Sequence, residues 1–124
     1  GPASAAHNAI RSTYPLHSVL EACPQVQDYA RSVIRSWDDL IDTADRVRPM
    51  LGISPAAWSD AQDAMGREAA AITLAAMLER TESIKSHGGY LRALTERKRG
   101  GKYSLGPVLQ ALRRAQLNRL DTTW

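Results

Sequence analysis

The sequence predicts an all-α protein, a compact bundle of about six to seven short helices around a central helix rich in alanine and leucine. Apolar residues recur at intervals of three and four along almost every segment, and in no segment do they alternate with polar residues over a strand's length. Serines and prolines stand where periodic segments begin, and glycines stand where several of them end. At 124 residues the chain can bury a core as one domain without a disulfide or a metal ion.

Three parts are expected along the chain. Residues 1–12 open with Gly-Pro, which is typical of a protease-cleavage scar, and continue with small and polar residues, so we expect a flexible segment there. Residues 13–120 should form the single helical domain. Residues 121–124 lack a stop signal and are expected to form a frayed tail.

Two short helices are expected ahead of residue 31. The first opens at Pro15, because proline suits the first helical position, and it ends before Cys23 and the proline that follows. The second covers about residues 24–30, with Val26 and Tyr29 pointing inward. Cys23 lies at helical spacing behind apolar residues, so we expect a buried thiol that packs as a small hydrophobe.

A third helix is expected over residues 37–51, with Ser36 as its cap. Its apolar residues form one stripe, and three aspartates are expected on the solvated opposite side, namely Asp38, Asp42 and Asp45. Pro49 removes a backbone donor and should kink or fray the last turn, and Gly52 closes it.

Two further helices follow in the middle of the sequence. Ser54 and the proline after it form a start signal for a fourth helix, which ends at Gly66. The fifth is expected over about residues 67–85 and is apolar nearly all round from residue 69 to residue 78. An apolar helix of this kind is buried, so this segment is the expected centre of the bundle.

The last two helices hold most of the basic residues. The sixth is expected over about residues 89–98, with Leu91 and Leu94 pointing inward and glycine pairs on both sides of it. Ser104 can cap a seventh helix that packs its leucines and frays from about residue 119.

Charge is divided unevenly between the two parts of the chain. Residues 1–79 hold six basic and ten acidic residues, a net charge of −4, whereas residues 80–124 hold ten basic and three acidic residues, a net charge of +7. A basic region of this kind attracts nucleic acid, anionic lipid or an acidic protein, and charge alone does not choose among them. An ordinary solvated face rich in arginine is the other explanation.

The run over residues 88–107 is the best candidate site. Two glycine pairs bracket a short helix, and this helix together with the residues just after it carries five basic residues, with a tyrosine near each end. Such a helix can follow a phosphate backbone, and an exposed tyrosine can stack on an unpaired base, although either tyrosine also fits the role of a core anchor. The predicted nucleic-acid-binding residues are Lys85, Tyr90, Arg92, Arg97, Lys98, Arg99, Lys102, Tyr103, Arg113 and Arg114.

No constellation of an enzyme is evident. The three histidines share no metal spacing with one another or with Cys23, and the glycines at 100 and 101 lack the strand and the Lys-Ser ending of a phosphate-binding loop. The pattern of aspartates in the third helix favours a solvated helix face over a binding site for a divalent cation. We therefore expect no catalysis, no metal and no cofactor.

The cellular location also follows from composition. A single cysteine suits a reducing cytoplasm, and the sequence contains no signal-peptide pattern and no apolar stretch of the length that a membrane span needs. We expect a cytoplasmic protein that has no membrane partner.

Several sequence words occur in a fixed order along the chain. They are 15–17 (Pro-Leu-His), 23–24 (Cys-Pro), 36–40 (Ser-Trp-Asp-Asp-Leu), 50–55 (Met-Leu-Gly-Ile-Ser-Pro), 70–80, 88–94 (Gly-Gly-Tyr-Leu-Arg-Ala-Leu) and 103–109 (Tyr-Ser-Leu-Gly-Pro-Val-Leu). With these words, residues 14–117 resemble the C-terminal region of RepC, the replication initiator of repABC-type plasmids in alphaproteobacteria. The turn at Tyr90 resembles, more weakly, the Tyr-x-x-x-Ile-x-x-x-Trp helix of DnaD-type primosome domains, with Lys98 in the place of the tryptophan.

The resemblance implies a plasmid replication protein that acts at the origin. Members of the family carry an N-terminal winged-helix region that reads duplex DNA, and nothing in this sequence matches it. Two functions are therefore open. The domain is an auxiliary DNA-binding module for single or double strands at the plasmid origin, or it is an interaction module. In the second case it docks host replication proteins, such as the helicase or its loader, or self-associates with another initiator copy.

Overall fold

The computed structural model describes residues 14–121, and that range contains only helices, turns and connections. The expectations for residues 1–13 and 122–124 lie outside it. The helices in chain order are α2 (Leu16–Ala22), η1 (Pro24–Tyr29), α3 (Trp37–Val47), η2 (Arg48–Leu51), α4 (Pro55–Met65), α5 (Arg67–Glu79), η3 (Thr81–Ser83), α6 (His87–Arg99) and α7 (Leu105–Asp121). The all-α bundle is confirmed.

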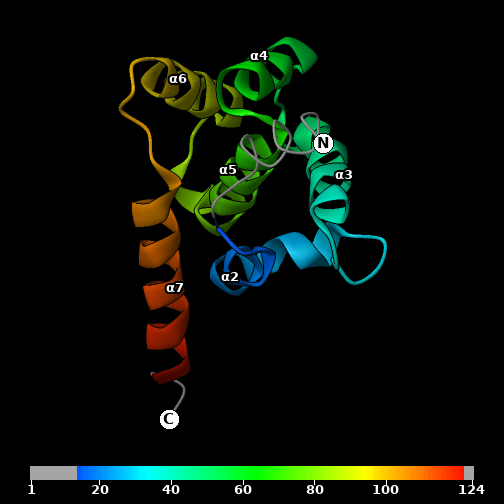
Figure 1. Cartoon of the computed structure of the whole chain (residues 1–124), viewed down its shortest axis with the longest axis vertical. Helices are drawn as coiled ribbons and strands as arrows, with labels where there is room; N and C mark the ends of the chain where they lie inside the picture. The colour runs from blue at the N-terminus through cyan, green and yellow to red at the C-terminus, as the bar shows by residue number, and fades with distance from the viewer. Residues whose placement is uncertain (1–13, 122–124) are drawn as a thin grey trace, which may run out of the picture.

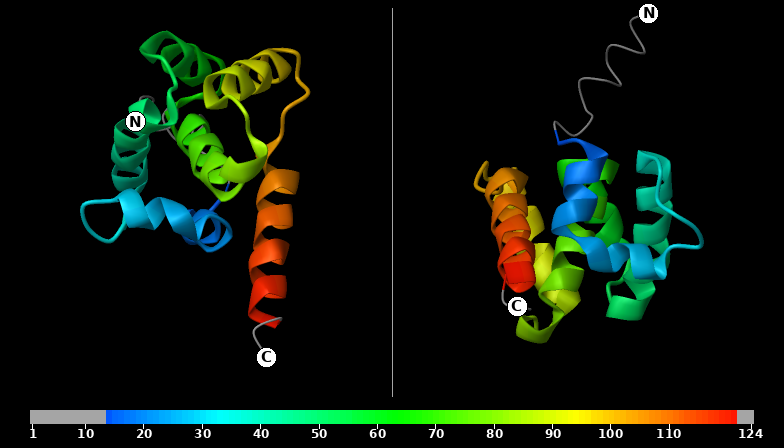
Figure 2. Two further views of the ribbon diagram at one scale, coloured as in Figure 1. Left: turned by 180° about the vertical axis from the view of Figure 1, so that it is seen from behind. Right: turned by 90° about the horizontal axis from the view of Figure 1, so that it is seen from below.

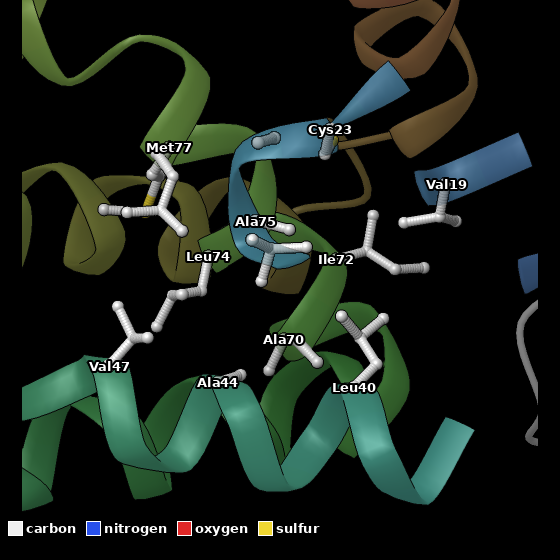
Figure 3. Packing of buried hydrophobic residues seen from close by; sticks show 14 of the residues in the cluster. Val19, Cys23, Leu40, Ala44, Val47, Ala70, Ile72, Leu74, Ala75 and Met77 are labelled. Atoms are coloured by element: carbon white, nitrogen blue, oxygen red, sulfur yellow. The ribbon is translucent and has the colours of Figure 1, made fainter. Parts of the chain in front are cut away.

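Helix α5 lies at the centre of the bundle, surrounded by the other helices (Figure 1). All of its residues from Ala70 to Leu78 are buried, and it packs against α3, α4, α7 and η1. In the close view, Leu40, Ala44 and Val47 of α3 point toward α5 (Figure 3). Because alanines leave room for a neighbouring backbone, α5 accepts helices on several sides, as the sequence predicts.

Local signals fix the ends of α3 as expected. The Ser36 hydroxyl accepts a hydrogen bond from the backbone N–H of Asp39 at 3.1 Å. Pro49 converts the last turn into the 3₁₀-helix η2, and Gly52 follows with φ 74°, a conformation that glycine adopts at low cost.

Asp45 was predicted to lie on the solvated side of α3, but it is half-buried. It accepts a hydrogen bond from the indole N–H of Trp58 at 2.9 Å. A buried indole N–H needs such an acceptor, and the bond links α3 to α4.

Two other predictions need correction in the first half of the chain and in α5. Residues 24–29 form a 3₁₀-helix, and Tyr29 is 40 % exposed although the spacing predicted it to point inward. Helix α5 ends at Glu79 instead of residue 85. There the hydroxyl of Thr81 donates to the carbonyl oxygens of Met77 and Leu78 at 3.3 Å, which satisfies acceptors that the helix leaves open.

The start of α6 also lies earlier than predicted. The Ser86 hydroxyl accepts the backbone N–H of Gly89 at 3.0 Å, so Ser86 caps the helix and the first glycine pair sits inside its first turn. Helices α6 and α4 lie side by side at one end of the molecule, and α7 packs along α2 and α5 (Figure 2). No helix within residues 14–121 has the length and apolar character needed to cross a membrane.

Candidate nucleic-acid interface

A groove of about 330 Å³ lies where α5, α6 and the start of α7 meet. We call it the α5–α6–α7 groove. Helix α5 contributes Thr73 and Met77, and Arg80 follows on the same helical face. Helix α6 contributes three residues at helical spacing, Tyr90, Leu94 and Arg97. The connection to α7 and the first turn of α7 complete the lining with Lys102, Tyr103, Ser104, Pro107 and Val108.

The end of α6 holds two of the groove's basic residues in a fixed relation. Gly101 has φ 70°, and its N–H bonds to the carbonyl of Lys98 while the N–H of Lys102 bonds to the carbonyl of Arg97 at 2.8 Å. This pair of bonds is the Schellman motif, which ends helices at a left-handed glycine. The Arg97 guanidinium closes the turn by donating to the Lys102 carbonyl at 3.1 Å. The second glycine pair therefore builds the basic corner of the groove.

The groove contains three cations and no acid. Arg80, Arg97 and Lys102 line it, and no Asp or Glu does so among residues 14–121. Their side chains form no ion pair in that part of the chain, in which every pair involves other basic residues. None of the three charges is neutralised by an ion pair within residues 14–121, and Arg80 also borders another hollow, which contains Glu79 and Glu82.

Tyr103 anchors the connection before α7 to the core. Its hydroxyl lies 2.8 Å from the hydroxyl oxygen of Thr73, which in turn donates to the sulfur of Met65 at 3.5 Å. Burial raises the pKa of the Tyr103 phenol. The ring is half-buried along the groove wall, whereas Tyr90 is 37 % exposed on the opposite helix. Of the two tyrosines, Tyr90 presents more surface to a ligand.

Two of the predicted binding residues are engaged in ion pairs instead. The Arg99 guanidinium donates to both carboxylate oxygens of Asp60 on α4 and to Glu96 at 3.2 Å. The hydrogen bond from Arg99 holds the pKa of the Asp60 carboxyl below its usual range. On α7, Arg113 pairs with Glu21 of α2 at 3.4 Å. For Arg99 and Arg113, the structure therefore shows links between helices in place of free cations.

Comparison of the sequence with known proteins identifies the family of this chain. Residues 15–115 match the sequence model described as the Replication protein C C-terminal region. The chain belongs to this family. It is 50 % identical over 103 residues to a protein of Rhizobium rhizogenes, and 50 % identical over 104 residues to a protein of Sinorhizobium fredii. Both relatives carry the name replication protein C, which confirms the resemblance to the RepC family that the sequence words indicate.

The matched region is only a part of those longer proteins. It covers 82 % and 83 % of this chain, but the chain spans about a quarter of each relative, 25 % and 26 %. No solved structure gives a significant match. The replication protein C C-terminal region includes the whole α5–α6–α7 groove, since its lining residues fall between 73 and 108.

The structure gathers only some of the predicted residues into the groove of this family member. Tyr90, Arg97, Lys102 and Tyr103 line it together. The others lie outside its lining: Lys85 in the connection before α6, Arg92, Lys98 and Arg99 on α6, and Arg113 and Arg114 on α7. The hydrogen bond from Arg99 is the main cause of the lowered pKa of Asp60, and the positive charge of Arg92 also lowers it.

Among the basic residues that line the groove, the sequence prediction missed one, Arg80. It follows the last residue of α5 and lies four and seven positions after Ala76 and Thr73, which both line the groove. The helical spacing predicts that Arg80 shares a face with Ala76 and Thr73, but the sequence does not reveal that this face of α5 borders a groove.

A second groove shows what the first lacks. It has a volume of about 430 Å³ along α3, and it contains Arg31 and Arg46 together with three aspartates, Asp39, Asp42 and Asp45. Mixed charge makes this surface a poor site for a polyanion.

No group of three acidic, histidine or cysteine side chains in residues 14–121 lies close enough together to bind a metal ion. Cys23 is buried, and burial raises the pKa of its thiol to about 12, far above that of a reactive thiolate.

Proposed function

We propose that this chain is the C-terminal region of a plasmid replication initiator that supports initiation at the plasmid origin by auxiliary DNA binding. The α5–α6–α7 groove and the exposed Lys98 beside it supply the contacts. The domain acts without catalysis and without a cofactor, and it leaves primary recognition of the origin to the rest of the protein.

The observation that carries the proposal is the convergence of Arg80, Arg97 and Lys102 without a carboxylate. The chain has 13 acidic residues, and three of them pair with arginines outside the groove lining, Asp60 and Glu96 with Arg99 and Glu21 with Arg113. Like charges that gather without partners repel one another, so the cluster gains most from an anionic ligand. A phosphate backbone supplies regularly spaced negative charges and releases counterions when cations neutralise them.

The test is fluorescence anisotropy of labelled single-stranded and duplex oligonucleotides at about 50 and 200 mM salt. We expect binding that weakens steeply as salt rises. Reversing three charges, Arg97→Glu, Lys98→Glu and Lys102→Glu, should abolish it, with circular dichroism showing that the helices persist. The matched control reverses three exposed arginines elsewhere, Arg31, Arg35 and Arg67, and should retain binding better. Absence of binding at low salt would reject the proposal.

A second candidate function has its own observation. Leu117 and Leu120 are 54 % and 64 % exposed and lie one helical turn apart near the end of α7, where this helix extends beyond the body of the bundle (Figure 1). Exposed leucines on one face suit a protein contact. Under this alternative, the domain docks host replication proteins, such as the helicase or its loader, or a second initiator copy. Concentration-dependent sedimentation that Leu117→Lys abolishes, in a chain that does not bind DNA, would favour it.

A further inference from the structure

We propose that the α5–α6–α7 groove holds one unstacked nucleotide of a single DNA strand, with its base against Tyr90 and its phosphates on Arg80, Arg97 and Lys102. This inference rests on the proposed DNA binding and specifies its substrate. It gives the domain a preference for single strands and assigns a role to Arg80, which the sequence did not single out.

The size and lining of the groove suit a single base. Its volume of about 330 Å³ is at the lower end of the range for small-molecule sites, roughly 300 to 1,000 Å³. Leu94, Met77 and Val108 supply apolar surface, and the rings of Tyr90 and Tyr103 line the same space. An aromatic base gains from stacking on such rings, whichever base it is.

The cations stand where the flanking phosphates of that nucleotide can reach them. Arg80 directly follows α5, Arg97 lies in the last turn of α6, and Lys102 lies in the connection after α6, so the charges line the same groove from different segments. Arg97 uses one guanidinium nitrogen on the Lys102 carbonyl, and an arginine has five N–H donors in all. The remaining donors can bind phosphate oxygens without disturbing the end of α6.

A duplex fits this site less well than a single strand. Bases in a duplex are paired and stacked, and one of them must be extruded at an energetic cost before it enters a pocket. A single strand presents bases that are already free. An acidic peptide would also meet the three cations, but the two tyrosine rings beside them favour a ligand that joins a flat aromatic group to negative charge.

The experiment compares three probes on the same chain. They are a labelled oligothymidine of about 12 nucleotides, which is within the site sizes of single-strand-binding folds, its duplex, and a strand of equal length that has abasic sugars throughout. We expect the affinity order oligothymidine, then abasic strand and duplex. Tyr90→Ala should weaken oligothymidine binding about 5- to 100-fold and bring it to the level of the abasic strand.

Matched variants separate stacking from charge. Tyr90→Phe keeps the ring and should retain the preference for bases, as should Tyr29→Ala, which removes a tyrosine of similar exposure, 40 %, outside the groove. Arg80→Gln should weaken the oligothymidine and the abasic strand by the same factor, whereas Arg31→Gln in the α3 groove should weaken neither as much.

The outcomes distinguish this inference from the proposed function. Equal affinity for oligothymidine and the abasic strand, still lost on charge reversal, would overturn the nucleotide site and leave DNA binding intact. Failure of every oligonucleotide to bind would overturn both. Binding of an acidic peptide that Tyr90→Ala weakens, without any binding of DNA, would overturn the nucleotide site and assign the groove to a protein partner.

Discussion

The two sides of helix α6 carry similar residues and meet different surroundings. On the side toward α4, Arg99 lies against Asp60 and Glu96, and its charge is neutralised. On the side toward α5 and α7, Arg97 lies near Lys102 and Arg80 in a groove without acids. The two arginines are only two positions apart in the sequence, yet one links two helices and the other is available to a ligand.

The difference shows that the number of basic residues in a segment is a poor measure of its binding capacity. Adjacent positions on a helix point about 100° apart, so residues 97 and 99 face different neighbours. Asp60 on α4 decides the role of Arg99, whereas nothing comparable faces Arg97. This contrast between the two sides of α6 can be tested first in the core helix α5 and then on each side of α6 separately.

The largest effect is expected from Leu74→Ala in α5, the helix that supports both sides. Leu74 is fully buried, so the change should lower the free energy of unfolding by about 2–5 kcal/mol through lost burial and the cavity that remains. Urea unfolding measures the loss. Oligonucleotide affinity of the folded fraction should persist, because neither charged surface changes. Leu117→Ala, at an exposed leucine, is the control and should alter stability by no more than about 0.5 kcal/mol.

A smaller effect, confined to the groove side, is expected from Tyr103→Phe. The change removes the hydrogen bond to Thr73 and should cost about 0.5–1.5 kcal/mol of unfolding free energy. The ring remains, so the apolar wall of the groove should persist. Tyr29→Phe removes a hydroxyl at an exposed position and serves as the control. If the two variants lost the same amount of unfolding free energy, Tyr103 would not anchor the connection before α7.

Helix boundaries could be predicted where the deciding atoms lie within one turn. Ser36 and Ser54 cap α3 and α4 by bonds to N–H groups three residues ahead, and Gly52 ends η2. These signals are local and can be read in one sequence. The same kind of signal at Ser86 was overlooked, because the two glycines after it suggested a loop instead of a first helical turn.

The candidate site could be predicted only in part, because its decisive contacts join distant residues. Arg99 and Asp60 are 39 positions apart, and Tyr103 and Thr73 are 30 positions apart. No local pattern reveals that an aspartate on α4 neutralises one arginine of α6, or that a threonine inside the core holds a tyrosine of a loop. The sequence pattern singles out the basic segment, but only the packing of the helices separates the paired cations in it from those without an ion pair.

A modest effect should distinguish Arg97 from Arg99 in the salt dependence of DNA binding. Removing one phosphate contact lowers the slope of log affinity against log salt by about 0.7 for single strands. We therefore expect a reduced slope for Arg97→Gln and an unchanged slope for Arg99→Gln. Anisotropy titrations over several salt concentrations give both values. A reduction of equal size in both variants would mean that the ligand displaces Asp60 from Arg99, and the contrast between the two sides would be lost.

The smallest effect is expected in the stability of the fold at low pH. In the folded chain the hydrogen bond from Arg99 lowers the pKa of Asp60, whereas an aspartate in the unfolded chain has a pKa of about 3.9. The pair therefore stabilises the fold above that unfolded value, and this contribution is lost as pH falls through the lower folded value. Because the pair is exposed, the gain is small and salt-sensitive.

Carboxyl-carbon NMR titration measures the pKa of Asp60 directly. Arg99→Gln should raise that pKa, because the guanidinium that stabilises the carboxylate is gone, and Arg97→Gln should leave it unchanged. The two variants remove the same charge from the same helix, two positions apart. If both raised the pKa equally, the general positive field of α6 would control Asp60, and the specific bond between α4 and α6 would have no part in separating the two sides.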